Sequence, residues 1–142
     1  MKRSVWRMGI GALILAGGAV AGVLPASASW GECSSGYLCL WGNRNYSGGP
    51  WFEKNANGSY NTGWSNNDET SSVANRSGSS SMYLYNDTNQ SSEHGVVCLP
   101  RGYSAPDLNE TNPEFDDRIS SLRIFSGACA SSVTAIGSPR SS

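Results

Sequence analysis

The sequence contains little histidine and no Cys-x-x-Cys pair. His94 is the one histidine among 142 residues, and none of the four cysteines forms a Cys-x-x-Cys pair. Because protein zinc sites are built from such residues, the composition argues against zinc. A Ser-His-Asp or Cys-His catalytic arrangement would have to use His94, which follows Ser-Ser-Glu in a polar turn. We therefore expect the protein not to be an enzyme.

The chain also lacks a second long apolar stretch after its N-terminal one. Lys2, Arg3 and Arg7 precede the apolar residues 10–24, and Ala-Ser-Ala at 26–28 resembles a cleavage site. The apolar stretch is shorter than the ~20 residues that span a bilayer, so the pattern predicts a secretory signal peptide over residues 1–28. We expect a secreted, extracellular monomer that does not contact a membrane.

Positive charge is scarce once this leader is removed. Three of the 10 Lys and Arg residues leave with it, whereas all 11 Asp and Glu residues remain, so the mature chain carries a net charge of −4. Nucleic acids and anionic membranes attract basic proteins, so neither is an expected partner. The mature length of 114 residues fits one domain, which we place at residues 29–129. Residues 130–142 are small and polar, and we expect a flexible tail.

No amphipathic helical pattern occurs after residue 29. Apolar residues do not recur at i, i+3, i+4 and i+7 over two turns, and short alternating segments are separated by Gly, Asn and Ser. We therefore predict an all-β fold, with residues 54–66 and 100–114 as loops. The predicted strands lie at residues 37–41, 50–53, 71–75, 82–85, 95–99 and 119–125.

The four cysteines are expected to form two disulfides, because secretion places them in an oxidising compartment. Three pairings are possible. We favour Cys33–Cys39, which closes a tight loop through Gly36, together with Cys98–Cys129, which ties the second half to the end of its last strand. Loop entropy assigns these bonds about 2.4 and about 3.7 kcal/mol of stabilisation.

Two short segments rich in oxygen ligands repeat 49 residues apart. Residues 67–72 read Asn-Asp-Glu-Thr-Ser-Ser and residues 116–121 read Asp-Asp-Arg-Ile-Ser-Ser, so both fit Asx-Asx-x-x-Ser/Thr-Ser. Carboxylate, amide and hydroxyl oxygens suit Ca²⁺ better than zinc or copper. One copy alone would indicate a polar turn. The repeat favours two similar structural units with calcium ligands in each.

The first half also contains the pattern Trp41-x-x-x-x-Tyr46-x-Gly48. One aromatic ring can pack over the other across a hairpin, while glycine permits a positive φ. Together with the repeated segments, this pattern resembles the Greek-key unit of the βγ-crystallin family. The resemblance covers roughly residues 37–125 and implies a Greek-key β-sandwich made from two units.

The second unit follows this pattern less closely. Tyr85 is in place, but Gln90 and Ser92 stand where the family has the second aromatic and the glycine. In the family, the two Asx-Asx segments lie side by side and each ion takes oxygens from both. The resemblance therefore implies two Ca²⁺ sites, which draw on Asn67, Asp68, Ser71, Asp116, Asp117 and Ser120, with backbone carbonyls near Glu69 and Arg118.

A narrower resemblance lies at the start of the mature chain. The leader followed by Cys33-Ser-Ser-Gly-Tyr-Leu-Cys39-Leu-Trp41 is similar to secreted actinobacterial proteins of peptidase inhibitor family I36. This resemblance implies an inhibitor of extracellular proteases, metalloproteases in particular. In the family the protease-facing bond follows a cysteine, and the segment Val97-Cys98-Leu99 resembles that region. We therefore predict Val97, Cys98 and Leu99 as protease contacts.

Other interpretations remain open. The protein could be a calcium-binding extracellular structural or stress module without inhibitory activity. It could also bind carbohydrate through Trp51, Tyr60 and Trp64, although such aromatics more often pack in a core or hairpin. Residues 95–99 could equally form an ordinary strand with a structural disulfide.

Overall fold

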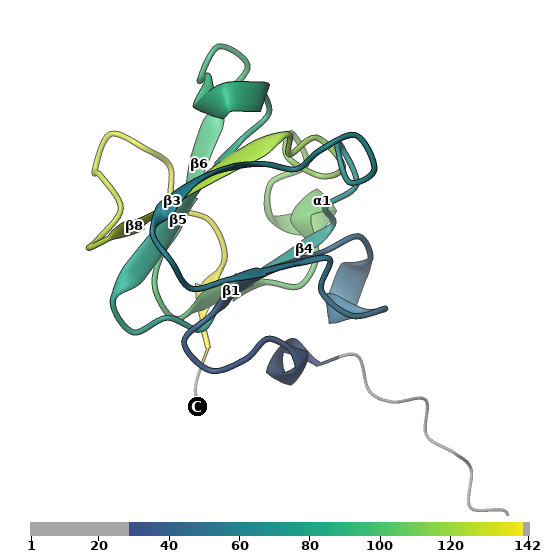
Figure 1. Cartoon of the computed structure of the whole chain (residues 1–142), viewed down its shortest axis with the longest axis vertical. Coiled ribbons are helices and arrows are strands. Elements are labelled where there is room, and N and C mark those ends of the chain that lie inside the picture. Colours follow the sequence, from purple (N-terminus) through teal and green to yellow (C-terminus); the bar gives the residue numbers. More distant parts are fainter. Residues whose placement is uncertain (1–28, 141–142) are drawn as a thin grey trace, which may run out of the picture.

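The computed structural model describes residues 29–140 and consists of two antiparallel β-sheets (Figure 1). The predicted signal peptide, residues 1–28, lies outside the described residues. The apolar faces of the two sheets share one core. The predicted all-β sandwich is thus confirmed. No helix within residues 29–140 is long and apolar enough to cross a membrane.

The first sheet contains five strands in the order β2-β1-β4-β7-β9. Strand β1 is buried on both faces: Leu38 and Leu40 point into the main core, whereas Cys39 and Trp41 pack in a second cluster on the other face. The strands are β1 (Leu38–Trp41), β2 (Phe52–Lys54), β4 (Ser72–Asn75), β7 (Tyr103–Ala105) and β9 (Ser138–Pro139).

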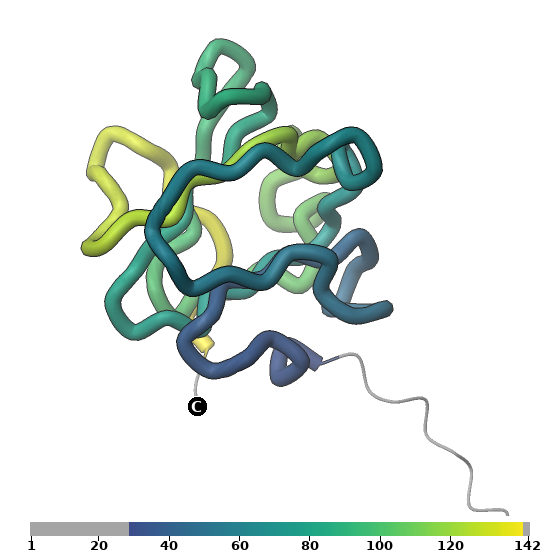
Figure 2. The backbone as a smooth tube through the Cα atoms, viewed as in Figure 1, coloured from purple at the N-terminus to yellow at the C-terminus, as the bar shows by residue number. Residues whose placement is uncertain are grey.

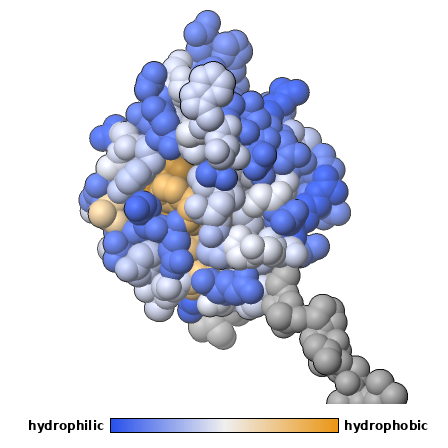
Figure 3. All heavy atoms as spheres, turned by 45° about the vertical axis from the view of Figure 1, so that its right-hand side comes forward, coloured by the Kyte–Doolittle hydropathy of each residue, from blue (hydrophilic) through white to orange (hydrophobic). Residues whose placement is uncertain are grey.

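The second sheet contains four strands in the order β3-β8-β5-β6. Its inner face supplies Met82, Leu84, Leu122 and Ile124, which are buried against the first sheet. The strands are β3 (Gly58–Asn61), β5 (Ser80–Tyr85), β6 (Val96–Leu99) and β8 (Ser121–Ser126). On the face shown in Figure 3, polar residues cover most of the surface and apolar residues appear in a narrow strip.

Each half of the chain contributes one strand to the sheet of the other half. Strand β3, from the first half, pairs with β8, so that Gly58 lies opposite Ile124. Strand β7, from the second half, pairs with β4, so that Val73 lies opposite Ala105. Because β4 and β8 directly follow the two repeated segments, this exchange brings residues 67–72 and 116–121 together (Figure 2).

The two exchanged strands were predicted to be loops, and this prediction was wrong. Strand β3 reads Gly-Ser-Tyr-Asn, and only Tyr60 of these residues packs on the core. Strand β7 has three residues. Its Tyr103 and Ala105 pack on the main core, but three residues are too few to give a clear strand pattern. Main-chain hydrogen bonds to a neighbouring strand hold each of the two segments in place. Leu108, the expected inward anchor of the second loop, is fully buried at the start of α1 (Leu108–Thr111).

Three single-turn 3₁₀ helices complete the described elements. The helix η1 follows Ser29, whose Oγ accepts a hydrogen bond from the backbone N–H of Gly31 at 3.0 Å. Such a cap satisfies a donor that has no partner inside the helix. The other two helices lie in the β1–β2 and β5–β6 hairpins. Their bounds are η1 (Trp30–Glu32), η2 (Arg44–Tyr46) and η3 (Thr88–Gln90).

The C-terminal segment packs on the domain, in contrast to the predicted flexible tail. The backbone N–H of Cys98 donates to the carbonyl of Thr134 at 2.9 Å, and that of Ile136 donates to the carbonyl of Cys98 at 2.9 Å. Ile136 is buried and β9 pairs with β7. A disulfide joins Cys98 to Cys129. The small, polar residues of this segment do not show in the sequence that a disulfide and one buried isoleucine hold it on the domain.

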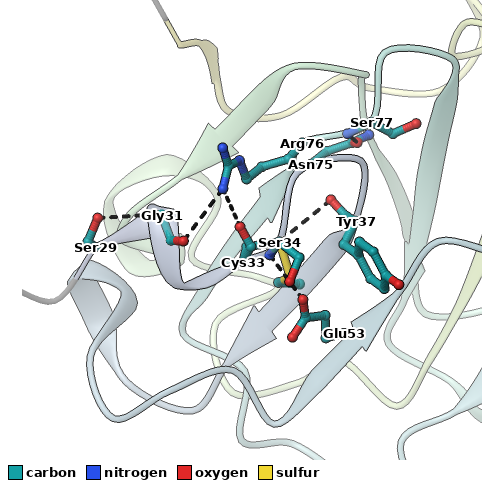
Figure 4. The surroundings of a disulfide bond; sticks show 10 residues. Ser29, Gly31, Cys33, Ser34, Tyr37, Glu53, Asn75, Arg76 and Ser77 are labelled. Atoms are coloured by element: carbon teal, nitrogen blue, oxygen red, sulfur yellow. Dashed lines mark hydrogen bonds between the residues drawn. A yellow bond between two sulfur atoms is a disulfide. The ribbon is translucent and has the colours of Figure 1, made fainter.

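The second disulfide, Cys33–Cys39, lies on the face of β1 that points away from the main core (Figure 4). The backbone N–H of Ser34 donates to Glu53 Oε1 at 3.0 Å. Hydrogen bonds from Ser34, with the side chain as the larger contribution, hold the pKa of the Glu53 carboxyl below its ordinary value. Arg76 Nη1 donates to the carbonyl of Cys33. Both disulfides follow the pairing favoured from the sequence.

The two ends of the described chain meet at the side chain of Trp30. The guanidinium of Arg76 lies 4.8 Å from the Trp30 ring centroid, and that of Arg140 lies 4.6 Å from it. Such cation–π contacts contribute about 0.5–1 kcal/mol each at exposed sites. Trp30 therefore links η1 to the end of β4 and to the C-terminal segment.

Candidate functional site

The two repeated segments contact each other through a crossed pair of hydrogen bonds. Ser71 Oγ donates to Asp117 Oδ1 at 2.8 Å, and Ser120 Oγ donates to Asp68 Oδ1 at 3.1 Å. Each serine thus binds the aspartate of the other segment. The predicted ligands Asp68, Ser71, Asp117 and Ser120 therefore lie side by side, as the family resemblance implies.

The backbone of the two segments is also equivalent. Asp68 has φ of 57° and Asp117 has φ of 53°. This left-handed conformation is uncommon for residues other than glycine, and aspartate is among those that tolerate it best. The backbone N–H groups of Ser71 and Ser120 donate to the carbonyls of Trp41 and Tyr85, both at 2.9 Å. The left-handed conformation therefore occurs at the same position in both segments, which share one turn geometry.

The last serine of each segment supports a hairpin. Ser72 Oγ donates to the carbonyl of Asn43 at 2.6 Å and accepts the backbone N–H of Tyr46 at 3.1 Å. In the second unit, Ser121 Oγ donates to the carbonyl of Asp87 at 2.5 Å and accepts the backbone N–H of Gln90 at 3.0 Å. The two hairpins therefore have equivalent hydrogen bonds.

Gln90 replaces Tyr46 without changing the hairpin backbone. The two residues have φ of 57° and 58°. The ring of Tyr46 packs edge-on against Trp41, with centroids 5.1 Å apart. The amide Nε2 of Gln90 instead donates to the carbonyls of Tyr60 and Leu122. The family pattern fails in the sequence here because hydrogen bonds from an amide take over the role of aromatic packing.

The remaining predicted ligands have unequal surroundings. Asn67 is exposed, and its Nδ2 donates to Asp68 Oδ2 at 2.9 Å. Asp116 is mostly buried; its Oδ2 lies 3.5 Å from Arg44 Nη2, and its Oδ1 is buried without a hydrogen-bond partner among the described residues. Arg44 Nε also pairs with Asp107 at 3.4 Å. The two halves of the site are thus similar in the aspartate and serine positions and different in the first Asx position.

The donor set fits Ca²⁺ and does not fit a transition metal. Within residues 29–140, no three His, Cys, Asp or Glu side chains are grouped so that they could hold a metal ion. The available ligands are single carboxylates, serine hydroxyls and backbone carbonyls, which are hard oxygen donors. Among the described residues, the carbonyls of Glu69 and Arg118 accept no hydrogen bond, and both side chains are exposed. Asp68 with Ser120 and Asp117 with Ser71 could each hold one ion.

The predicted protease-contact residues do not lie at the surface. Cys98 and Leu99 have no exposed area and Val97 is 3% exposed. They belong to β6, which pairs with β5, and Cys98 is bound further by Thr134 and Ile136. A protease cannot reach side chains that are packed in the core of the folded domain. This prediction is therefore corrected: the segment is a structural strand.

Of the three aromatics considered for carbohydrate binding, two serve in packing. Trp51 and Tyr60 are partly buried and pack against the main core, and the ring of Phe52 lies between them in edge-on contacts. Trp64 is fully exposed. The aromatics therefore do not form a common platform.

The sequence did not reveal an ion pair beside residues 67–72 and 116–121, which are named the crossed segments here. His94 Nδ1 lies 2.7 Å from Asp87 Oδ1, and the backbone N–H of His94 donates to Asp87 Oδ2 at 2.8 Å. Both residues line a surface hollow with Asp68, Asp117 and Arg118. The side-chain hydrogen bond and the charge of Asp87 raise the pKa of His94. The backbone and side-chain hydrogen bonds from His94 lower the pKa of Asp87.

This ion pair predicts how the stability of the domain depends on pH. The contribution of His94 to the free energy of unfolding is fully present below its ordinary pKa of 6.5, and it is lost as the pH rises through the raised pKa. The contribution of Asp87 to the free energy of unfolding is present above its ordinary pKa of 3.8, and it is lost as the pH falls through the lowered pKa. Between these limits the pair is charged. Asp87→Asn should therefore lower the pKa of His94 towards 6.5, as followed by NMR titration of the imidazole.

Glu93→Gln is the control variant, because Glu93 contributes least to the shift. It should lower the pKa of His94 less than Asp87→Asn does. An unchanged pKa of His94 in Asp87→Asn would show that the pair does not form in solution.

Comparison with known proteins extends these observations. The chain resembles three solved βγ-crystallin-type structures. One comes from work on the evolution of the eye-lens βγ-crystallin domain fold, with 22% identity, a TM-score of 0.54 and coverage of 66% of this chain and 89% of that one. The N-terminal domain of protein S has 18% identity, a TM-score of 0.50 and coverage of 66% and 99%. The third is the Ca²⁺-bound βγ-crystallin domain of the Abundant Perithecial Protein from Neurospora crassa, with 14% identity, a TM-score of 0.53 and coverage of 68% and 97%.

These likenesses establish the βγ-crystallin fold, as predicted. Among curated proteins, none matches the chain. The model of peptidase inhibitor family I36 matches residues 26–97, which is half of the chain. This family consists of peptidase inhibitors and not of enzymes. The chain therefore belongs to peptidase inhibitor family I36 and has the βγ-crystallin fold.

Proposed function

We propose that the protein is a secreted inhibitor of extracellular proteases, with metalloproteases as its principal targets. The observation that carries this proposal is the match to the inhibitor family over residues 26–97. Secretion is supported by the basic, apolar and small-residue pattern of residues 1–28 and by four cysteines that all form disulfides.

The domain has the rigidity that such an inhibitor needs. An inhibitor that docks as a preformed surface loses little conformational entropy on binding, so more of its contact energy appears as affinity. Here each disulfide closes a loop within one half, and the exchanged strands β3 and β7 tie the two halves together. Main-chain hydrogen bonds also hold the connecting loops to the sheets, from Ser71 to Trp41 and from Ser120 to Tyr85.

The test of inhibition uses the mature protein and three protease classes. We expect slow dissociation and stoichiometric inhibition of a thermolysin-like metalloprotease, measured by titration of residual activity, with weaker inhibition of subtilisin-like and trypsin-like enzymes. Reduced and alkylated protein is the control and should inhibit none of them, because the disulfides maintain the docking surface. If the native protein inhibits none of the three classes, the proposal is wrong.

We further propose that two Ca²⁺ ions stabilise the domain at the crossed segments. Support comes from the pairing of Asp68 with Ser120 and of Asp117 with Ser71, and from the buried Asp116 Oδ1 without a partner among the described residues. A structural neighbour from Neurospora crassa was solved in its Ca²⁺-bound form. Each proposed site has one carboxylate from the crossed pair, so we expect a modest dissociation constant of about 10⁻⁵ to 10⁻³ M.

Calcium binding predicts a gain in stability that depends on one carboxylate. At free Ca²⁺ about 100 times the dissociation constant, each site should add about 2.7 kcal/mol to the free energy of unfolding. Asp117→Asn keeps a side chain that tolerates the left-handed backbone and can still accept from Ser71, but it removes the charge. We expect it to weaken calcium binding by calorimetry and to leave the apo melting temperature nearly unchanged.

Glu110→Gln, an exposed acidic residue on α1, is the matched control and should bind Ca²⁺ like the wild type. Absence of binding heat at millimolar Ca²⁺, with an unchanged melting temperature, would contradict the calcium proposal. A protein that binds Ca²⁺ but inhibits no protease would instead be a calcium-binding structural module, which is the second candidate function.

A further inference from the structure

One large apolar side chain on the described surface is left without packing partners. Trp64 has a relative exposure of 102%, and it is the one large hydrophobic residue within residues 29–140 that stands out in this way. The other described tryptophans are placed differently: Trp41 is buried, Trp51 packs on the core, and Trp30 lies between two guanidinium groups. Trp64 therefore contributes little to folding, and its exposure needs another explanation.

The loop that carries Trp64 is fixed at both ends. At its start, the backbone N–H and Oγ1 of Thr62 donate to the carbonyl of Ser120 at 3.0 and 3.1 Å. At its end, Asn67 Oδ1 accepts from Thr62 Oγ1 at 3.4 Å, and Asn67 Nδ2 donates to Asp68. Gly63 has φ of 75°, which turns the chain directly after the first anchor. Residues 62–67, here named the Trp64 loop, join β3 to the segment before β4 (Figure 2).

The composition of the Trp64 loop suits an apolar pocket. Residues 62–67 read Thr-Gly-Trp-Ser-Asn-Asn and carry no charge. Moving this loop into a protein pocket would therefore desolvate no ionised group, which is the costly part of burying polar residues. Tryptophan is the residue type most enriched among the anchors that dominate protein–protein affinity.

The polar groups around Trp64 favour a protein partner over a carbohydrate. A sugar that stacks on an aromatic ring also needs free amide or hydroxyl groups beside it. Here the amide of Asn61 donates to Asn89 Oδ1 at 3.0 Å and accepts the Asn89 backbone N–H at 2.8 Å. The amide of Asn67 is engaged by Thr62 and Asp68. Both amides that line the hollow beside Trp64, and the hydroxyl of Ser120, are thus already bound within the protein. Thr88 supplies the one lining hydroxyl that has no hydrogen bond among the described residues.

We propose that the Trp64 loop is the protease-docking element, and that the indole of Trp64 fills an apolar substrate pocket of the enzyme. This inference rests on the proposed inhibitory function. It supplies a surface contact in place of residues 97–99, which are buried in β6. The fixed ends hold the indole away from the domain before binding, so docking orders few additional residues.

The experiment compares Trp64→Ala with the neighbouring variant Ser65→Ala in the mature protein. Inhibition constants are measured against the protease that the wild type inhibits most strongly. Trp64→Ala should raise the inhibition constant about 30-fold or more, as expected for an interface hot spot. Ser65→Ala, an exposed position in the same loop, should change it by about twofold or less. Trp64→Phe should restore part of the inhibition. The melting temperatures of all three variants should equal that of the wild type.

The outcomes separate this inference from the proposed function. If the wild type inhibits but Trp64→Ala inhibits equally well, docking occurs elsewhere and the inhibitory function stands. If the wild type inhibits no protease, the proposed function and the docking inference both fail. A lowered melting temperature for Trp64→Ala would show that the indole packs on the domain and would contradict a protease-docking role.

Discussion

The structure depends on the exchange of hydrogen bonds between two equivalent segments at the junction of its halves. Ser71 binds Asp117 and Ser120 binds Asp68, so neither segment is complete without the other. The exchange of strands β3 and β7 holds this arrangement in place, because β4 and β8 begin where the two segments end. The fold therefore positions four oxygen-bearing side chains through its topology rather than through a single loop.

The same junction connects the parts to which we assign function. The Trp64 loop begins at a hydrogen bond to the carbonyl of Ser120 and ends at Asn67, so both of its anchors are residues of the crossed segments. The Asp87–His94 pair lines a surface hollow together with Asp68 and Asp117 of the same segments. An ion bound at the crossed segments would stiffen the anchors of the Trp64 loop.

The sequence predicted the features that depend on repetition and on strong side-chain chemistry. The two Asx-Asx segments, the all-β sandwich and the preferred disulfide pairing all follow from residues that could be identified individually. The sequence did not reveal β3, β7 and β9, because these short strands are held by main-chain pairing and carry almost no apolar signal. It misplaced the protease contact, because Val97, Cys98 and Leu99 resemble the protease-facing segment of the family but are buried. Val97 and Leu99 lie in the main core, and the C-terminal residues return over Cys98.

We propose that calcium binds between the two halves of the domain and takes ligands from both. The most direct test is a crystal structure of the mature protein grown with millimolar Ca²⁺. Our account requires two ions, one held by Asp68 with Ser120 and the other by Asp117 with Ser71, with each ion bridging residues 67–72 and 116–121. A structure without ions at these residues, or with an ion held by one segment alone, would contradict it.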